Sequence, residues 1–230
     1  MDPIQIISLT LGAAWASGIN LYAAVLVLGY LGATGNIVLP AELQVLTNPL
    51  VFGAAGLMYV IEFFADKIPG VDSGWDVIHT FIRIPAGAAL AAGMAQGLEI
   101  NQGAEFAAML VGGGIAATSH AAKTGTRLLI NTSPEPVTNW SASIAEDIAV
   151  VGGLWASLQY PWVFMAVLAL FLLLLTWLMP KIWGALKRTF RSLRNIFKGR
   201  RLPDTEPQST NGIKVELLRT LYQDSAEKDR

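Results

Sequence analysis

The sequence has no cysteine and is poor in charged residues. Of its 230 residues only 14% are Asp, Glu, Lys or Arg, whereas 53% are hydrophobic. Charged residues make up about a quarter of an average soluble globular domain. The absence of cysteine excludes disulfides, thiolate metal ligands and a cysteine nucleophile. The shortage of charge, together with the hydrophobic excess, predicts an integral membrane protein.

Common cofactor and catalytic motifs are also missing. The glycine-rich stretches GVDSG and GGG match neither a P-loop nor a dinucleotide fingerprint, and there is no HExxH or GxSxG motif. Carboxylates with His79 and His120 offer oxygen and nitrogen ligands, but no closely spaced ligand motif joins them. We therefore expect no cofactor and no metal centre. The N-terminal segment has the acidic Asp2 where a signal peptide would carry Lys or Arg, and it lacks a cleavage site, which predicts a retained span instead of a signal peptide.

Six segments are long and apolar enough to cross a bilayer, which takes about 20 helical residues. They are 4–32, 49–66, 76–97, 104–130, 139–157 and 160–180. Only the last is uninterrupted; the others are rich in Gly, Ala and Ser, which let helices pack closely. The fold class expected is an all-α integral membrane protein with six transmembrane helices.

Orientation follows from the basic residues near the connections. The connections 33–49, 97–104 and 157–160 contain no Lys or Arg, whereas the other two are bordered by Lys67, Arg83, Lys123 and Arg127. The positive-inside rule then puts these two connections and both termini in the cytoplasm.

The chain also divides into two similar halves, 4–97 and 104–180. Each has a long helix, a proline-containing turn (Pro49 and Pro134) and a shorter helix with a central Glu (Glu62 and Glu146). With three spans each, the halves form a predicted inverted repeat of the kind found in transporters. The alternative is that any six-span chain divides into threes.

Polar residues recur at helical spacing inside these segments. Glu62 and Asp66 are spaced i,i+4, while Asp76, His79 and Arg83 share the spacing i, i+3, i+7 with His120, Lys123 and Arg127. The candidate substrate-binding or proton-relay residues are Asn20, Glu62, Asp66, Asp76, His79, Arg83, His120, Lys123, Arg127, Glu146 and Asp147. Ser17 and Tyr22 add uncharged hydrogen-bonding groups near Asn20.

Two interpretations of these residues stay open. Ionisable groups within membrane spans are costly and commonly functional, and imidazole titrates near neutral pH. They would then line a polar cavity or relay protons. The alternative is a set of structural ion pairs, with Lys67, Arg83 and Arg127 anchoring at the interface and reaching water.

The segment after the last span is strongly basic. Residues 181–201 predict an amphipathic interfacial helix that binds anionic lipids through Lys187, Arg188, Arg191, Arg194 and Lys198, not a nucleic-acid site. Residues 202–230 are expected to form a flexible cytoplasmic tail. The alternative for its last part is a short amphipathic helix that binds a partner or a second copy of the chain. The domains expected are therefore 1–180, 181–201 and 202–230.

Three segments carry a resemblance to a known family. ASGINLYAAVLVLGYLG (16–32), ADKIPGVDSGWDVIHTFIRIPAGA (65–88) and HAAKTGTRLLINTSPEPVTNWSASIAEDI (120–148) resemble the signature segments of an uncharacterised family of small bacterial integral membrane proteins, defined as a domain of unknown function. The resemblance covers most of residues 8–160. It implies the bacterial inner membrane and no particular activity.

Three functions are expected from these patterns. The leading one is a transporter or translocase for a small anionic or phosphate-bearing substrate, with a carboxylate or His carrying a coupling proton. The second is an intramembrane lipid-phosphate enzyme that uses His79 or His120. EFFADKIPGVDSG is similar to acidic, proline-containing re-entrant segments of polyprenyl-diphosphate phosphatases and of phosphate-lipid translocases, although it lacks their Ser-Arg-Ser element. The third is a non-catalytic membrane scaffold.

Overall fold

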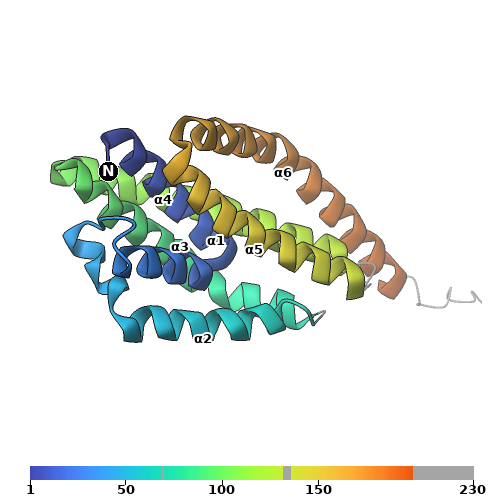
Figure 1. Ribbon diagram of the computed structural model, residues 1–230. Coiled ribbons are helices and arrows are strands. Elements are labelled where there is room, and N and C mark those ends of the chain that lie inside the picture. Colours follow the sequence, from blue (N-terminus) through green and yellow to red (C-terminus); the bar gives the residue numbers. More distant parts are fainter. Residues whose placement is uncertain (69, 132–135, 199–230) are drawn as a thin grey trace, which may run out of the picture. The chain divides into compact units, whose positions relative to one another are not determined.

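The computed structural model of the chain is all-helical over the residues it describes, 1–68, 70–131 and 136–198. The elements, shown in Figure 1, are α1 (Pro3–Ala33), the 3-10 helix η1 (Ala41–Thr47), α2 (Pro49–Ala65), α3 (Val71–Ala95), the 3-10 helix η2 (Gln96–Leu98), α4 (Gln102–Ile130), α5 (Pro136–Gln159) and α6 (Pro161–Lys198). Met1–Met179 forms one compact unit and Pro180–Arg230 another.

Local sequence signals explain where these helices begin. Proline, which fits the first helical turn, opens α1, α2, α5 and α6. The side chains of Asp2, Asn48 and Asn101 accept hydrogen bonds from backbone N–H groups at the starts of α1, α2 and α4. The helices therefore match the predicted segments closely, except that α3 begins five residues earlier than expected, at Val71, and α6 continues past Pro180.

The predicted C-terminal features are only partly covered. The backbone is helical to Lys198, but the side chains of Lys187, Arg188, Arg191, Arg194 and Lys198 lie outside what the structure describes. The predicted tail, 202–230, also lies outside the described residues.

Several helices have the length and composition of membrane spans. Among the described residues, three qualify on their own, Pro3–Ala33, Val71–Leu98 and Pro161–Leu178. The pair formed by η1 and α2, bent by 65°, is a fourth if it counts as one span. α4 and α5 fall outside this set; both carry charged side chains within their length. The composition of the helices is that of a membrane protein with three to four candidate spans.

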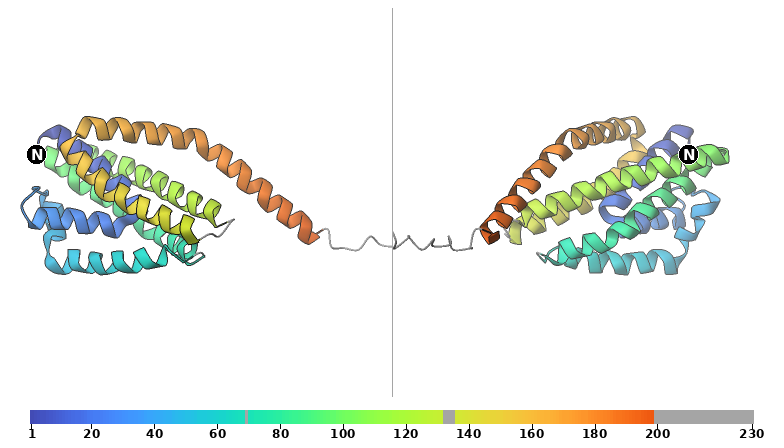
Figure 2. Two further views of the ribbon diagram at one scale, coloured as in Figure 1. Left: turned by 45° about the vertical axis from the view of Figure 1, so that its right-hand side comes forward. Right: turned by 180° about the vertical axis from the view of Figure 1, so that it is seen from behind.

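α1 is not one straight helix. Asn20 has non-helical backbone angles, φ −147° and ψ 95°, and interrupts the helix near its middle. Figures 1 and 2 show that the chain turns back there, so that the second half of α1 returns toward the end of the bundle where the first half began. Contacts agree: the side chains of Ile6 and Pro40 both come within 3.3 Å of the point where a Cβ on Gly97 would lie. The segment predicted over 4–32 is therefore a candidate span by length and composition, but it is broken at Asn20 and does not run straight.

This fold-back changes where the N-terminus lies. It shares one end of the bundle with the connections after α1 and after α3, as the Ile6, Pro40 and Gly97 contacts require. The turn that contains Lys67 lies at the opposite end, after α2 has run the length of the bundle (Figure 1). The N-terminus and the Lys67 turn thus lie at opposite ends of the bundle, and the predicted placement of both termini in the cytoplasm stays a prediction.

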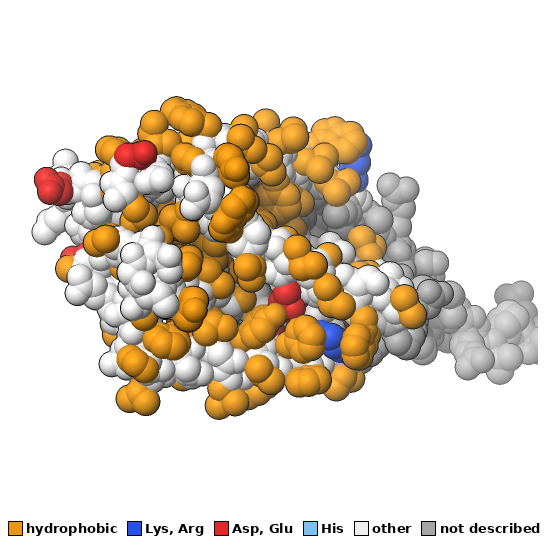
Figure 3. All heavy atoms as spheres, in the orientation of Figure 1, with side chains coloured by type: hydrophobic (Ala, Val, Ile, Leu, Met, Phe, Trp, Pro, Cys, Tyr) orange, Lys and Arg blue, Asp and Glu red, His pale blue; other side chains and the backbone are white. Residues whose placement is uncertain are grey.

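The bundle has apolar residues outside and charged residues inside. Leu50 and Phe81 are each 81% exposed, whereas Glu62, Arg83 and Arg127 are completely buried. Figure 3 shows apolar side chains over much of one face, with few charged groups among them. Small residues permit close helix crossings inside: a Cβ on Gly18 would collide with Ala116 and Ser119 of α4. This distribution is the reverse of a soluble domain and is what a lipid environment favours.

Candidate functional site

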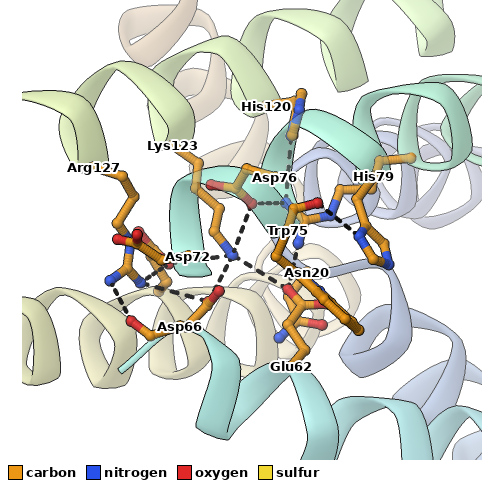
Figure 4. A network of polar contacts seen from close by, with 12 residues as sticks. Asn20, Glu62, Asp66, Asp72, Trp75, Asp76, His79, His120, Lys123 and Arg127 are labelled. Carbon is orange, nitrogen blue, oxygen red and sulfur yellow. Dashed lines mark hydrogen bonds and ion pairs between the residues drawn. The ribbon is translucent and has the colours of Figure 1, made fainter. Parts of the chain in front are cut away.

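A cluster of ion pairs fills the space between α2, α3, α4 and α5 (Figure 4). We call it the charged cluster and define it by the residues that form its salt bridges: Glu62, Asp66, Asp76, Arg83, Lys123, Arg127 and Glu146. The i,i+4 and i, i+3, i+7 spacings bring these side chains together, because residues so spaced share one face of a helix. All seven were candidates from the sequence.

Lys123 is the hub of the charged cluster. Its Nζ lies 2.8 Å from Asp66 Oδ2 and 3.2 Å from Glu62 Oε1. The same ammonium lies 3.5 Å from Glu146 Oε2 and 3.8 Å from Asp76 Oδ1. One buried cation thus contacts every carboxylate of the cluster and links helices α2, α3, α4 and α5.

The two arginines divide the carboxylates between them. Arg83 binds Glu62 through Nη2 and Asp76 through Nη1, the latter at 3.0 Å. Arg127 binds Glu146 at 2.7 Å and Asp66 at 3.5 Å. Arg127 also donates to the backbone carbonyl of Asp66 and to Oδ1 of Asn139, at 3.0 and 3.1 Å. Neither guanidinium reaches water, in contrast to the interfacial anchors of the alternative interpretation.

The charged cluster has more acids than bases. Its four carboxylates face three cations, so full ionisation leaves one negative charge in excess. Glu62 Oε2, Asp66 Oδ1 and Asp76 Oδ2 are buried without a hydrogen-bond partner. Because unpaired charge and unsatisfied oxygen atoms are costly in a dry interior, this arrangement favours the uptake of a positive charge.

Both histidines border the charged cluster and use both ring nitrogens. His79 Nδ1 lies 2.8 Å from the carbonyl oxygen of Trp75, and its Nε2 lies 3.0 Å from the hydroxyl of Tyr22. His120 Nε2 lies 2.7 Å from Thr80 Oγ1, while its Nδ1 lies 3.3 Å from both an Arg83 nitrogen and the carbonyl oxygen of Gly18. Neither ring presents a free nitrogen to a substrate.

The break in α1 meets the charged cluster directly. Asn20 Oδ1 accepts a hydrogen bond from the backbone N–H of Ala23 at 3.0 Å, so Asn20 caps the second half of the helix. Its Nδ2 donates to Asp147 Oδ1 at 3.1 Å. Ser17 Oγ donates to the carbonyl oxygen of Arg83 at 2.8 Å. The hydrogen bond between the candidates Asn20 and Asp147 thus joins the break in α1 to α5, next to Glu146 of the charged cluster.

Lys67 and Asp72 lie near the charged cluster but have structural partners. Lys67 Nζ donates to the carbonyl oxygen of Phe63 at 2.9 Å and to Ser143 Oγ at 3.3 Å, and it lies over the Phe63 ring. Burial lowers the pKa of Lys67, although Asp147 and Asp66 oppose this effect. Asp72 accepts hydrogen bonds from the backbone N–H of Gly70 and from Asn131. These contacts fasten the α2–α3 turn.

Several polar neighbours were not predicted from the sequence. They are Tyr59, Thr80, Asn131, Asn139 and Ser143. None is charged, so the selection of ionisable residues passed over them. Thr80 lies in the signature segment 65–88, and Asn131, Asn139 and Ser143 lie in the segment 120–148, but only the tertiary contacts place them beside the charged cluster.

Two cavities of the described structure are apolar. One, of about 360 Å³, is lined by Trp15, Gly152 and Phe164 among others; the second, of about 290 Å³, is lined by residues such as Leu11, Leu98 and Val111. Neither includes a residue of the charged cluster. They offer space for hydrocarbon, not for an anion.

Comparison with known proteins gives a family and no function. Neither curated proteins nor solved structures yielded a match. One family model matches residues 7–181, which include the whole charged cluster and the break in α1. By this match over most of its length, the chain belongs to the family described as "Domain of unknown function (DUF4126)".

Proposed function

We propose that the protein is a membrane transporter or translocase for an anionic or phosphate-bearing substrate, coupled to protons at the charged cluster. The observation that carries this proposal is the sharing of three completely or almost completely buried cations, Arg83, Lys123 and Arg127, among four carboxylates. Arginine and lysine are the residues that bind phosphate and carboxylate groups. Charges this deep in a membrane protein commonly mark a transport pathway.

The charge balance suggests how a proton and an anion are coupled. Every cation of the charged cluster is already held by carboxylates, so an incoming anion must replace one of them. A proton taken up beside the cations lowers the negative charge that holds them. Glu62, for example, is one of the two carboxylates that hold Arg83 and one of the four around Lys123. The released cations are then available to the substrate. Proton uptake and anion binding would thereby favour each other.

The membrane arrangement that we propose has five crossings and one re-entrant hairpin. α2 to α6 each cross once, and α1 enters and returns on one side with Asn20 at its tip. Broken helices with their tips at depth are a feature of transporters, where they bring helix ends to the substrate. The positive-inside rule then puts the Lys67 turn in the cytoplasm of a bacterial inner membrane and the N-terminus outside.

The inverted repeat is not needed for this function. α4, which the repeat would pair with α1, is continuous from Gln102 to Ile130, whereas α1 is broken at Asn20. The six-span repeat therefore stays a prediction, and the contrast between these two helices counts against it.

Transport in proteoliposomes tests the proposal. The probes are inorganic phosphate, for uptake, and a fluorescent polyprenyl phosphate, whose movement between leaflets is followed with a membrane-impermeant quencher. We expect Glu62→Gln and Arg127→Ala to abolish transport of the probe that the native protein moves, with the exposed Glu42→Gln as matched control. Monodispersity and thermal stability show that each variant is folded. Transport of neither probe by the native protein, or normal transport by both variants, would contradict the proposal.

The remaining candidates receive less support. In an enzyme that uses His79 or His120, a substrate would have to take the place of a present hydrogen-bond partner, because all four ring nitrogens are engaged. A membrane scaffold is favoured by one observation, the mutual pairing of all three cations of the charged cluster. Unchanged transport in the variants above, together with lowered thermal stability, would support the scaffold.

A further inference from the structure

Asp147 is a carboxylate at the charged cluster that forms none of its ion pairs. Its Oδ1 accepts a hydrogen bond from Asn20, but its Oδ2 is buried and has no hydrogen-bond partner. The preceding residue, Glu146, is in contrast paired with Arg127 at 2.7 Å. Two neighbouring acids of α5 thus have opposite environments.

Two cations face Asp147, but no ion pair joins either of them to it among the described residues. The groups around it are Asn20 of α1, Tyr59 of α2, Asp66 and Lys67 after α2, and Lys123 of α4. Lys123 is shared among four carboxylates, and the Lys67 ammonium is held by the Phe63 carbonyl and Ser143. Even if Lys67 is counted, five carboxylates face four cations. An ionised Asp147 would therefore leave a negative charge without compensation.

We propose that Asp147 binds a proton at neutral pH and is the site where the charged cluster takes up and releases it. In the neutral form Oδ2 carries the proton, and Oδ1 keeps the hydrogen bond from Asn20. A proton is the fitting ligand because, within the described parts of the chain, no three His, Asp or Glu side chains converge as a metal site requires. Only the coupling to transport rests on the proposed function; the proton site itself does not.

The position of Asn20 links this proton to the fold. The same side chain that donates to Asp147 also caps the second half of α1 through Ala23. Loss of the proton converts a neutral acceptor into an anion next to the start of that half-helix. A change in the protonation state of Asp147 therefore changes the charge beside the break in α1, at the tip of the hairpin.

Infrared spectroscopy of the full-length protein in detergent tests this inference without a substrate. A protonated carboxyl group gives a C=O stretching band that ionised carboxylates lack and that shifts in D₂O. We expect this band at neutral pH and its loss in Asp147→Asn, which resembles the neutral form in shape and hydrogen bonding. Glu42→Gln, at an exposed acid, is the matched control and should leave the band unchanged.

A second variant keeps the test decisive if Asp147→Asn does not fold. Tyr59→Phe removes a hydroxyl that faces the carboxyl group and should shift the frequency of the band without abolishing it. The absence of the band in the native protein, its survival in Asp147→Asn, or an unshifted band in Tyr59→Phe would each overturn the proposal. None of these outcomes depends on whether transport of either probe is observed.

Discussion

Ile6, near the start of α1, and Pro40, beyond its end, meet at a single residue, Gly97. Both side chains come within 3.3 Å of the position that a Cβ on Gly97 would occupy. A straight helix of 31 residues would be about 46 Å long, at about 1.5 Å per residue. The contact at Gly97 is therefore possible only because α1 turns back at Asn20.

Cysteine labelling tests this topology, since the native chain has no cysteine. Single cysteines at Asp2, Asn36 and Asn101, all exposed, should react with a membrane-impermeant maleimide from the same side of the membrane. A cysteine at Ile68, exposed in the α2–α3 turn, should react only from the other side. Labelling of positions 2 and 36 from opposite sides would show that α1 crosses once.

Removal of the Asn20 side chain should destabilise the protein more than removal of an ordinary cap. Asn20→Ala loses a helix cap, which costs about 1 kcal/mol. It also leaves Oδ1 of the half-buried Asp147 without its Asn20 donor, at a further cost of about 1–3 kcal/mol. Asn48→Ala, which removes only the cap of α2, is the matched control. Thermal unfolding in detergent measures both, and equal losses would argue against the Asp147 contact.

The hub cation should be indispensable for folding. Lys123→Met leaves four carboxylates with only two cations, and breaking a buried ion pair from one side costs about 3–5 kcal/mol. We expect a large loss of thermal stability or of monodisperse protein. Lys67→Met is the control, because that ammonium forms no ion pair within the charged cluster. Equal stability of the two variants would contradict the role of Lys123.

A double-mutant cycle should show that Arg127 and Glu146 act together. Arg127→Met leaves Glu146 with only the longer ion pair to Lys123, and Glu146→Gln leaves Arg127 with only the longer ion pair to Asp66. The double variant removes both charges of the contact at 2.7 Å. The cost of the double variant should be smaller than the sum of the single costs by about 0.5–3 kcal/mol. Strict additivity in unfolding measurements would mean that the pair contributes no coupling.

Close packing between α1 and α4 should make Gly18 intolerant of a methyl group. An added Cβ collides with the side chain of Ser119 and the backbone of Ala116, so Gly18→Ala should cost about 1–3 kcal/mol. Gly53→Ala is the control, as nothing lies within 4 Å of its added Cβ. Alanine is the better helix former there and should stabilise α2 by about 0.5–1 kcal/mol. A stable Gly18→Ala protein would contradict the crossing geometry.

The amino-acid sequence alone determined the helices and the polar stripes. Runs of apolar residues, capping residues and prolines located the helices, because these signals act within a few residues of the chain. The i, i+3, i+7 spacing in Asp76 to Arg83 and in His120 to Arg127 likewise predicted which side chains share a face. Those side chains meet in the structure, which is why all seven members of the charged cluster were among the candidates.

Only the tertiary structure decided the path of α1 and the partner of each charge. Hydropathy measures the cost of transfer into lipid and contains no direction, so residues 4–32 indicated a single crossing. The break at Asn20 is held by partners far away in the chain, Asp147 on α5 and the α4 helix packed on Gly18. Which acid stays outside the ion pairs depends on the same long-range packing, and so does the proton site proposed at Asp147.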